Sequence, residues 1–118
     1  MMKSNVLQSK SQAFAVRTIK FYKHLCSKNE FVLGKQILKS GTSIGANIRE
    51  SRNAQSPSDF ISKMNIALKE ADETQYWLEI MHDAGIINRT EYEALNNDIK
   101  ELIALLTSSI KTLKKNQH

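Results

Sequence analysis

The sequence of 118 residues contains one cysteine, one proline and four glycines, and each scarcity excludes a class of protein. Cys26 has no second cysteine for an internal disulfide, which excludes a disulfide-stapled domain. One proline and four glycines are too few for the turns of an all-β protein. No apolar run approaches the roughly 20 residues that cross a bilayer, so we expect no membrane segment. A helical protein remains.

The composition predicts one globular domain spanning residues 1–118. Hydrophobic residues make up 41% of the chain and charged residues 25%, close to the averages of soluble domains. The first residues lack the apolar stretch of a secretory signal, so we expect a cytoplasmic location. Cys26 is interpreted as a small residue of the buried core.

Apolar residues recur every three or four positions in four segments, which predicts helices at about 5–28, 30–54, 57–84 and 90–114. The first carries Phe14, Thr18, Phe21 and Leu25 on one stripe, which is widened by Ala15, Ile19, Tyr22 and Cys26. The fourth has the strongest periodicity, with a heptad-like seam. Its members are Tyr92, Leu95, Ile99, Leu102, Leu106 and Leu113. Short connections predict an all-α, antiparallel, up-down-up-down four-helix bundle.

Residues that favour helix ends set these boundaries. Asn29 and Gly85 are predicted to stop the first and third helices. Ser56 is predicted to cap the third helix. Thr90 and Glu93 have the spacing of a capping box, so we expect them to begin the fourth helix.

Three glycines interrupt the periodic pattern of the second segment. Gly34, Gly41 and Gly45 each cost about 1 kcal/mol relative to alanine in a helix. We nevertheless predict a continuous helix, because glycines on one face let a neighbouring helix approach closely. The Gly41–Gly45 segment resembles a phosphate-binding loop, but it lacks the lysine and the preceding strand that such a loop needs.

Charge is distributed unevenly along the chain. Residues 1–29 contain six cations and no acid, whereas residues 56–85 contain two lysines and six acids. These two segments are electrostatic opposites. They can neutralise each other within one bundle or across a subunit interface, and the sequence leaves both alternatives open.

The first two helices carry the candidate phosphate-contacting residues, since Lys and Arg supply most contacts to nucleic-acid backbones. The chain has a net charge of +5, which favours such a partner. A solvent-exposed basic face with no partner is the alternative. The candidate nucleic-acid-binding residues are Lys10, Arg17, Lys20, Lys23, Lys28, Lys35, Lys39, Arg49 and Arg52.

Polar residues form a second candidate site on the second and third helices. Ser40, Ser43, Asn47 and Glu50 recur at helical spacing beside the glycine face. They are interpreted either as a hydrogen-bonded network with the third helix or as a ligand or subunit contact. The third-helix candidates are Glu70, Glu73, Tyr76 and Trp77, with Thr74 between them. Tyr76 and Trp77 suit a bundle core or an oligomer interface, and the core interpretation is preferred.

No set of residues predicts catalysis, a cofactor or a metal site. Glu79 and His82 have the Glu-x-x-His spacing of di-iron bundles, but a di-metal site needs a second copy of that pair. His24 and His118 show no ligand spacing. Ser43 and Cys26 lack an identifiable base, so we predict a protein that is not an enzyme.

Several segments together resemble a known family. They are Ser40–Glu50 (SGTSIGANIRE), Asp59–Ile61, Ala67–Ala71 and Glu73–Leu78. The chain resembles the bacterial 23S rRNA-intervening-sequence proteins from Phe14 to Ile110. This resemblance implies a four-helix bundle that assembles into a homopentamer and whose molecular function is poorly defined. In fold it is also similar to pentameric accessory proteins of diversity-generating retroelements, which bind a reverse transcriptase and nucleic acid.

We therefore predict a non-enzymatic homopentameric scaffold whose basic surface binds RNA or DNA without sequence preference. The alternative is a protein-interaction adaptor that binds no nucleic acid, for example one that serves a polymerase or a toxin-antitoxin-like partner.

Overall fold

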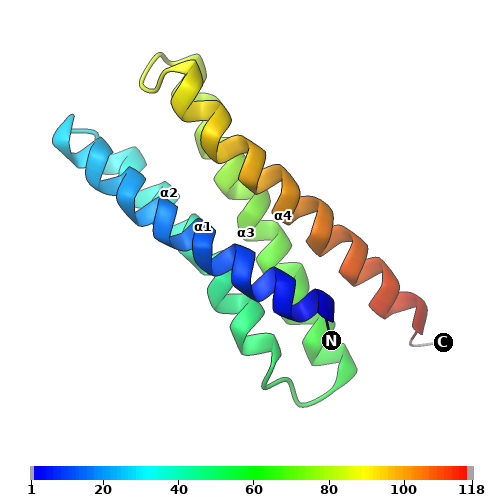
Figure 1. Cartoon of the computed structure of the whole chain (residues 1–118). Coiled ribbons are helices and arrows are strands. Elements are labelled where there is room, and N and C mark those ends of the chain that lie inside the picture. Colours follow the sequence, from blue (N-terminus) through cyan, green and yellow to red (C-terminus); the bar gives the residue numbers. More distant parts are fainter. Residues whose placement is uncertain (1, 117–118) are drawn as a thin grey trace.

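The computed structural model describes the backbone of residues 2–116 and the side chains of residues 6–116, so His118 lies outside the described part. Four helices follow one another: α1 Met2–Ser27, α2 Phe31–Ser51, α3 Pro57–Asp83 and α4 Arg89–Asn116. Figure 1 shows them running antiparallel in succession, as predicted. The resulting rod measures 49 × 21 × 20 Å.

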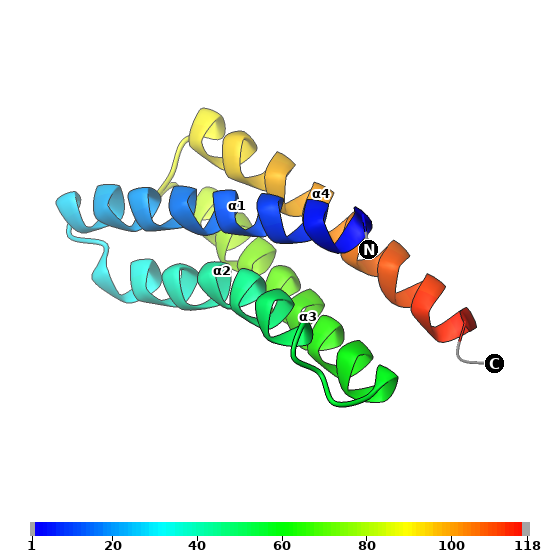
Figure 2. The same ribbon diagram turned by 60° about the horizontal axis from the view of Figure 1, so that its bottom comes forward.

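The helices are not packed equally closely around the bundle. The pairs α1–α2, α2–α3 and α3–α4 pack closely, whereas α1 and α4 pack against each other much less closely. In Figure 2, α1 and α4 cross while α2 and α3 run side by side. The α1–α4 edge is therefore the open side of the bundle.

Left-handed residues end two of the helices as predicted. Asn29 has φ 63°, and Gly85 has φ 75°. The residue after each of them donates a backbone hydrogen bond to the last turn of the helix. Glu30 N donates to Leu25 O at 2.9 Å, and Ile86 N donates to Met81 O at 2.9 Å. These are the bonds of a Schellman motif, which satisfies carbonyls that the helix leaves without partners.

The start of α3 is also as predicted, but the start of α4 is not. Ser56 Oγ accepts the Asp59 N–H at 3.0 Å, which caps α3. The capping box of α4 lies two residues before the predicted Thr90–Glu93 pair. Asn88 Oδ1 accepts the Glu91 N–H at 2.8 Å, and the Asn88 N–H donates to Glu91 Oε1 at 2.9 Å. Asparagine caps as well as threonine does, so spacing alone did not distinguish the two pairs.

The second helix is continuous through its glycines, as predicted, but it ends at Ser51 rather than Ala54. After Ser51 the α-helical hydrogen bonds give way to tighter turns, in which the backbone N–H groups of Arg52, Asn53 and Ala54 donate to carbonyls only three residues earlier. The predicted close approach is confirmed. Gly34 faces Tyr22, Gly41 faces Thr18 and Gly45 faces Ser11, all on α1.

The core contains most of the residues that the periodic patterns predict. Fully buried side chains come from all four helices, among them Phe14, Leu25, Ile37, Ile44, Leu78, Ile99, Leu102 and Leu106. Several predicted core residues are more exposed than expected, among them Ile19 and Cys26. Ile19 is 42% exposed, and Cys26 is only half-buried, because both lie at the outer margin of the α1 stripe.

Candidate interaction surface

Three of the predicted phosphate-contacting residues on α1 and just after it already have partners. Lys10 Nζ lies 3.2 Å from Glu101 Oε2, and Arg17 pairs with Asp98. Lys28 Nζ donates to the Ile86 carbonyl at 3.4 Å. A phosphate would have to displace these partners, which lowers its gain in free energy.

The pairing follows from spacing along α1. Lys10, Arg17 and His24 are seven residues apart, so they share one side of the helix, which faces α4. His24 Nε2 lies 2.7 Å from Glu91 Oε2 at the third level. Three exposed or half-exposed pairs of this kind thus bridge the open α1–α4 edge.

The other predicted cations form a more open set. All are exposed, and none has a carboxylate oxygen within 4.0 Å among residues 6–116. They are Lys20 and Lys23 on α1, Lys35, Lys39 and Arg49 on α2, and Arg52 at the C-terminal cap of α2. The only acid within α2 is Glu50, whose Oε1 is 3.4 Å from Lys63 Nζ of α3. The outer side of α2 therefore presents positive charge without an acid paired to it.

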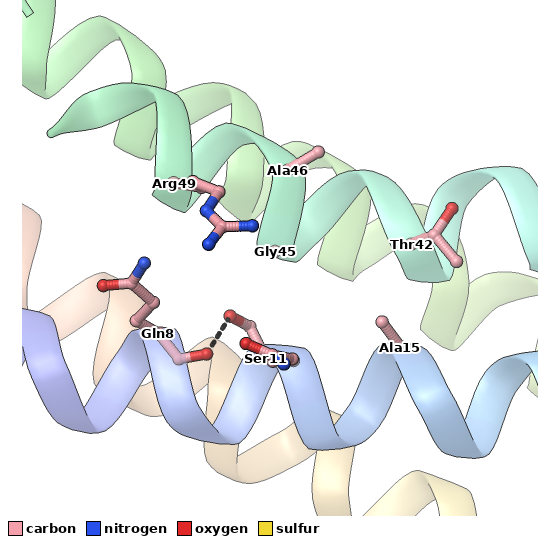
Figure 3. Close-up of a pocket in the computed structure, with 8 residues that line it drawn as sticks. Gln8, Ser11, Ala15, Thr42, Gly45, Ala46 and Arg49 are labelled. Carbon is pink, nitrogen blue, oxygen red and sulfur yellow. Dashed lines mark hydrogen bonds between the residues drawn. The ribbon is translucent and has the colours of Figure 1, made fainter. Parts of the chain in front are cut away.

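A groove of about 270 Å³ lies between α1 and α2. Its floor and walls carry mostly small side chains, and its lining is Gln8, Ser11, Gln12, Ala15, Thr42, Gly45, Ala46 and Arg49. Figure 3 shows Arg49 extending from α2 across the groove toward Gln8 of α1. The groove exists because Gly45 and Ala46 leave little side-chain volume between the helices. It places a guanidinium beside a concave surface lined by small side chains.

The predicted polar stripe on α2 does not form one network. Ser40 reaches α3, where its hydroxyl is hydrogen-bonded to that of Thr74 at 2.9 Å in the buried core. Ser43 and Asn47 instead bond within α2, to the carbonyls of Lys39 and Ser43 respectively. Glu50 reaches α3 through Lys63. The stripe therefore joins α2 to α3 at two separate points.

The acidic candidates on α3 differ in environment. Burial and the nearby Glu73 carboxylate raise the pKa of Glu70, an effect that Lys39 and Lys69 partly oppose. Glu73 Oε2 accepts the Trp77 Nε1–H at 3.1 Å. Glu73 thus belongs to α3's own surface and makes no hydrogen bond with the α2 stripe in the described structure.

The two neighbouring aromatic residues have different roles. Trp77 packs against the core, which agrees with the preferred interpretation. Tyr76 is 54% exposed, and its ring meets that of Trp77 edge-on at 5.3 Å. Tyr76 is therefore a surface residue, and the core interpretation is wrong for it.

Residues that could support metal chemistry are dispersed. Within residues 6–116, no three His, Cys, Asp or Glu side chains gather closely enough to hold a metal ion. His82 stacks on Tyr92 with ring centroids 4.6 Å apart. Among the described residues, no helix is both long and apolar enough to cross a membrane.

Sequence reasoning missed one group of cations. Lys111, Lys114 and Lys115 are exposed near the end of α4. The signal was present, because the sequence contains no acid after Glu101.

Comparison with known proteins places this geometry in a family. A crystal structure of a protein of unknown function from the S23 ribosomal protein family of Bacteroides thetaiotaomicron is 57% identical, with a TM-score of 0.90. The match covers 92% of this chain and 98% of that one. None of the curated proteins compared with the chain matches it. The family model of the 23S rRNA-intervening sequence protein matches residues 3–108. The chain therefore belongs to the 23S rRNA-intervening sequence protein family.

Proposed function

We propose that this protein is a non-enzymatic, homo-oligomeric scaffold of the cytoplasm that binds RNA or DNA through the exposed cations of α2 and its C-terminal cap. The pentameric state is what the family resemblance implies. The observation that carries the binding proposal is a set of exposed cations that have no carboxylate oxygen within 4.0 Å among the described residues: Lys35, Lys39, Arg49 and Arg52. Such a surface gains free energy from counterion release when it meets a phosphate backbone.

The surface proposed to bind nucleic acid is smaller than the one predicted from the sequence. Lys10 and Arg17 are engaged by α4. Lys20 and Lys23 lie beside exposed apolar side chains, a pattern that suits contact with protein better than contact with phosphate. Arg49 is the best placed of the α2 cations, because it lies beside the groove and can donate two parallel hydrogen bonds to a phosphate.

The test is a fluorescence-anisotropy titration of labelled RNA and DNA with nuclease-treated protein at two salt concentrations. The triple variant K35A/R49A/R52A is expected to bind all sequences more weakly, with the salt slope reduced by about one for each phosphate that is no longer neutralised. The matched control is K111A/K114A/K115A, which removes the same charge from α4. Equal losses of affinity in both variants would mean that net charge, rather than the α2 surface, attracts the nucleic acid.

The adaptor that binds no nucleic acid is the second candidate. Exposed apolar side chains on three helices support it, namely Val16, Ile19, Phe31, Val32, Ile66 and Tyr76. Absence of binding to RNA and DNA at low salt would select the adaptor over the nucleic-acid scaffold. Light scattering on the same sample tests the oligomer in either case.

A further inference from the structure

The opposite charges of α1 and α3 do not meet inside the bundle. The two helices occupy opposite corners, and no Cα of α1 lies within 8 Å of a Cα of α3 among the described residues. The α1 cations that find acidic partners find them on α4. Within one bundle, no ion pair joins α1 to α3 in the part of the chain that the structure describes, so the direct pairing that the sequence left open is absent there.

The outer face of α1 carries a regular stripe of mixed character. Val16, Ile19, Lys20 and Lys23 stand at positions i, i+3, i+4 and i+7, so they share one face of the helix. All four are exposed, with Val16 at 46% and Ile19 at 42%. Apolar side chains and ammonium groups therefore lie side by side on α1.

The outer face of α3 carries the complementary stripe. Asp72, Tyr76, Glu79 and Asp83 stand at i, i+4, i+7 and i+11, and all four are exposed. Neither Asp72 nor Glu79 has a cation within 4.0 Å among the described residues. The exposed Lys69, one turn before Asp72, is the nearest cation along the helix. Here an aromatic ring lies between carboxylates.

We infer that the α1 stripe of one copy docks on the α3 stripe of a second copy of this chain. This inference rests on the homo-oligomer of the proposed function and identifies the faces that would meet. In such a contact Val16 and Ile19 lose water against Tyr76, while Lys20 and Lys23 meet carboxylates of the α3 stripe. The apolar contact contributes affinity, and the ion pairs contribute register and partner choice.

The placement of the two stripes determines the type of assembly. They lie on opposite corners of the bundle, so each copy offers one face to the copy before it and the other to the copy after it (Figure 2). Such head-to-tail contacts close into a ring or continue as a filament. In both cases α2 stays at the side of the contact, and its cations remain accessible to nucleic acid.

Charge reversal tests the pairing. K20E/K23E and D72K/E79K each turn attraction into repulsion, and each is expected to raise the dissociation constant for self-association by at least about tenfold. The variant with all four changes restores the opposite charges in exchanged positions. It is expected to assemble again, with a mass by light scattering like that of the unmodified protein. Circular dichroism checks that each variant is folded.

The control is K111E/K114E, which reverses two exposed lysines of α4 outside both stripes and is expected to assemble normally. If the unmodified protein assembles but the reversals leave its mass unchanged, the pairing of α1 with α3 is wrong, and the oligomer stands. If K20E/K23E instead weakens RNA binding without changing the mass, the pairing is also wrong, and the α1 stripe is a nucleic-acid contact. If the unmodified protein is a monomer at every concentration, the oligomer and the pairing both fail.

Discussion

Thr18 and Gly41 face each other across the α1–α2 interface so closely that a Cβ at position 41 would lie 2.7 Å from Thr18 Cγ2. Thr18 cannot readily turn away, because it is 1% exposed and its hydroxyl donates to the Phe14 carbonyl at 2.8 Å. We expect Gly41→Ala to lower the free energy of unfolding by about 1–2 kcal/mol, because overpacking exceeds the gain in helix propensity. Urea denaturation measures this.

Gly45→Ala is the matched control, since its Cβ would meet Ser11 at 3.4 Å, an ordinary contact. It is expected to leave stability unchanged or to raise it by up to about 1 kcal/mol. A loss at position 45 as large as that at position 41 would show that the helix interface, rather than Thr18, sets the penalty. The double variant T18A/G41A should recover part of the loss.

The Asn88–Glu91 capping box gives a second prediction. Asn88→Ala is expected to cost about 1 kcal/mol, whereas Thr90→Ala, at the position predicted from spacing, should change little. Chemical denaturation of the two variants compares them directly. An equal loss in both would contradict the observed cap.

Glu91 also makes this cap dependent on pH. The Asn88 backbone N–H is the main cause that holds the pKa of Glu91 below its ordinary value of 4.5, with Lys28 and His24 adding to it against an opposing burial effect. A lowered folded pKa contributes stability that is present above the unfolded pKa and is lost as pH falls through the folded pKa. Stability should therefore fall on acidification below about pH 4.5, and less steeply in Glu91→Gln. Thermal melts at several pH values measure the slope.

Glu70 has the opposite sign. Its pKa lies above 4.5, chiefly because of burial, so its ionised form destabilises the fold at neutral pH. Glu70→Gln is expected to raise Tm at neutral pH, and the advantage should disappear as pH falls below about 4.5. Glu93→Gln, exposed and outside both stripes, serves as the control. A lower Tm for Glu70→Gln at neutral pH would mean that Lys39 and Lys69 outweigh burial.

The buried Ser40–Thr74 hydrogen bond predicts non-additive losses. Thr74→Val leaves the Ser40 hydroxyl without its partner on α3 and is expected to cost about 1–2 kcal/mol. The double variant S40A/T74V removes both hydroxyls, so its loss should be smaller than the sum of the single losses. Additive losses in urea denaturation would show that the bond contributes no coupling.

Periodicity predicted the helices well because burial repeats along a single segment, as in the seam that includes Ile99 and Leu106. It predicted poorly wherever the outcome depended on a second element. The sequence predicted Lys10 and Arg17 as phosphate ligands, but in the structure α4 places an acid beside each of them. Tyr76 and Trp77 are adjacent in sequence, yet the position of the core separates their roles.

The α1–α4 edge has a consequence for how the bundle opens. Elsewhere the helices separate only by exposing a packed interface, whereas at this edge Lys10–Glu101 and Arg17–Asp98 bridge a sparsely packed gap. Exposed ion pairs are weakened by salt, and packed interfaces are not. Native-state hydrogen exchange should therefore find the lowest-energy opening at this edge, with amides of α1 and α4 exchanging faster as salt is raised while those between α2 and α3 stay protected. Three of the four helix interfaces would then be held by close packing, whereas the fourth, between the first and last helices, would be closed mainly by ion pairs.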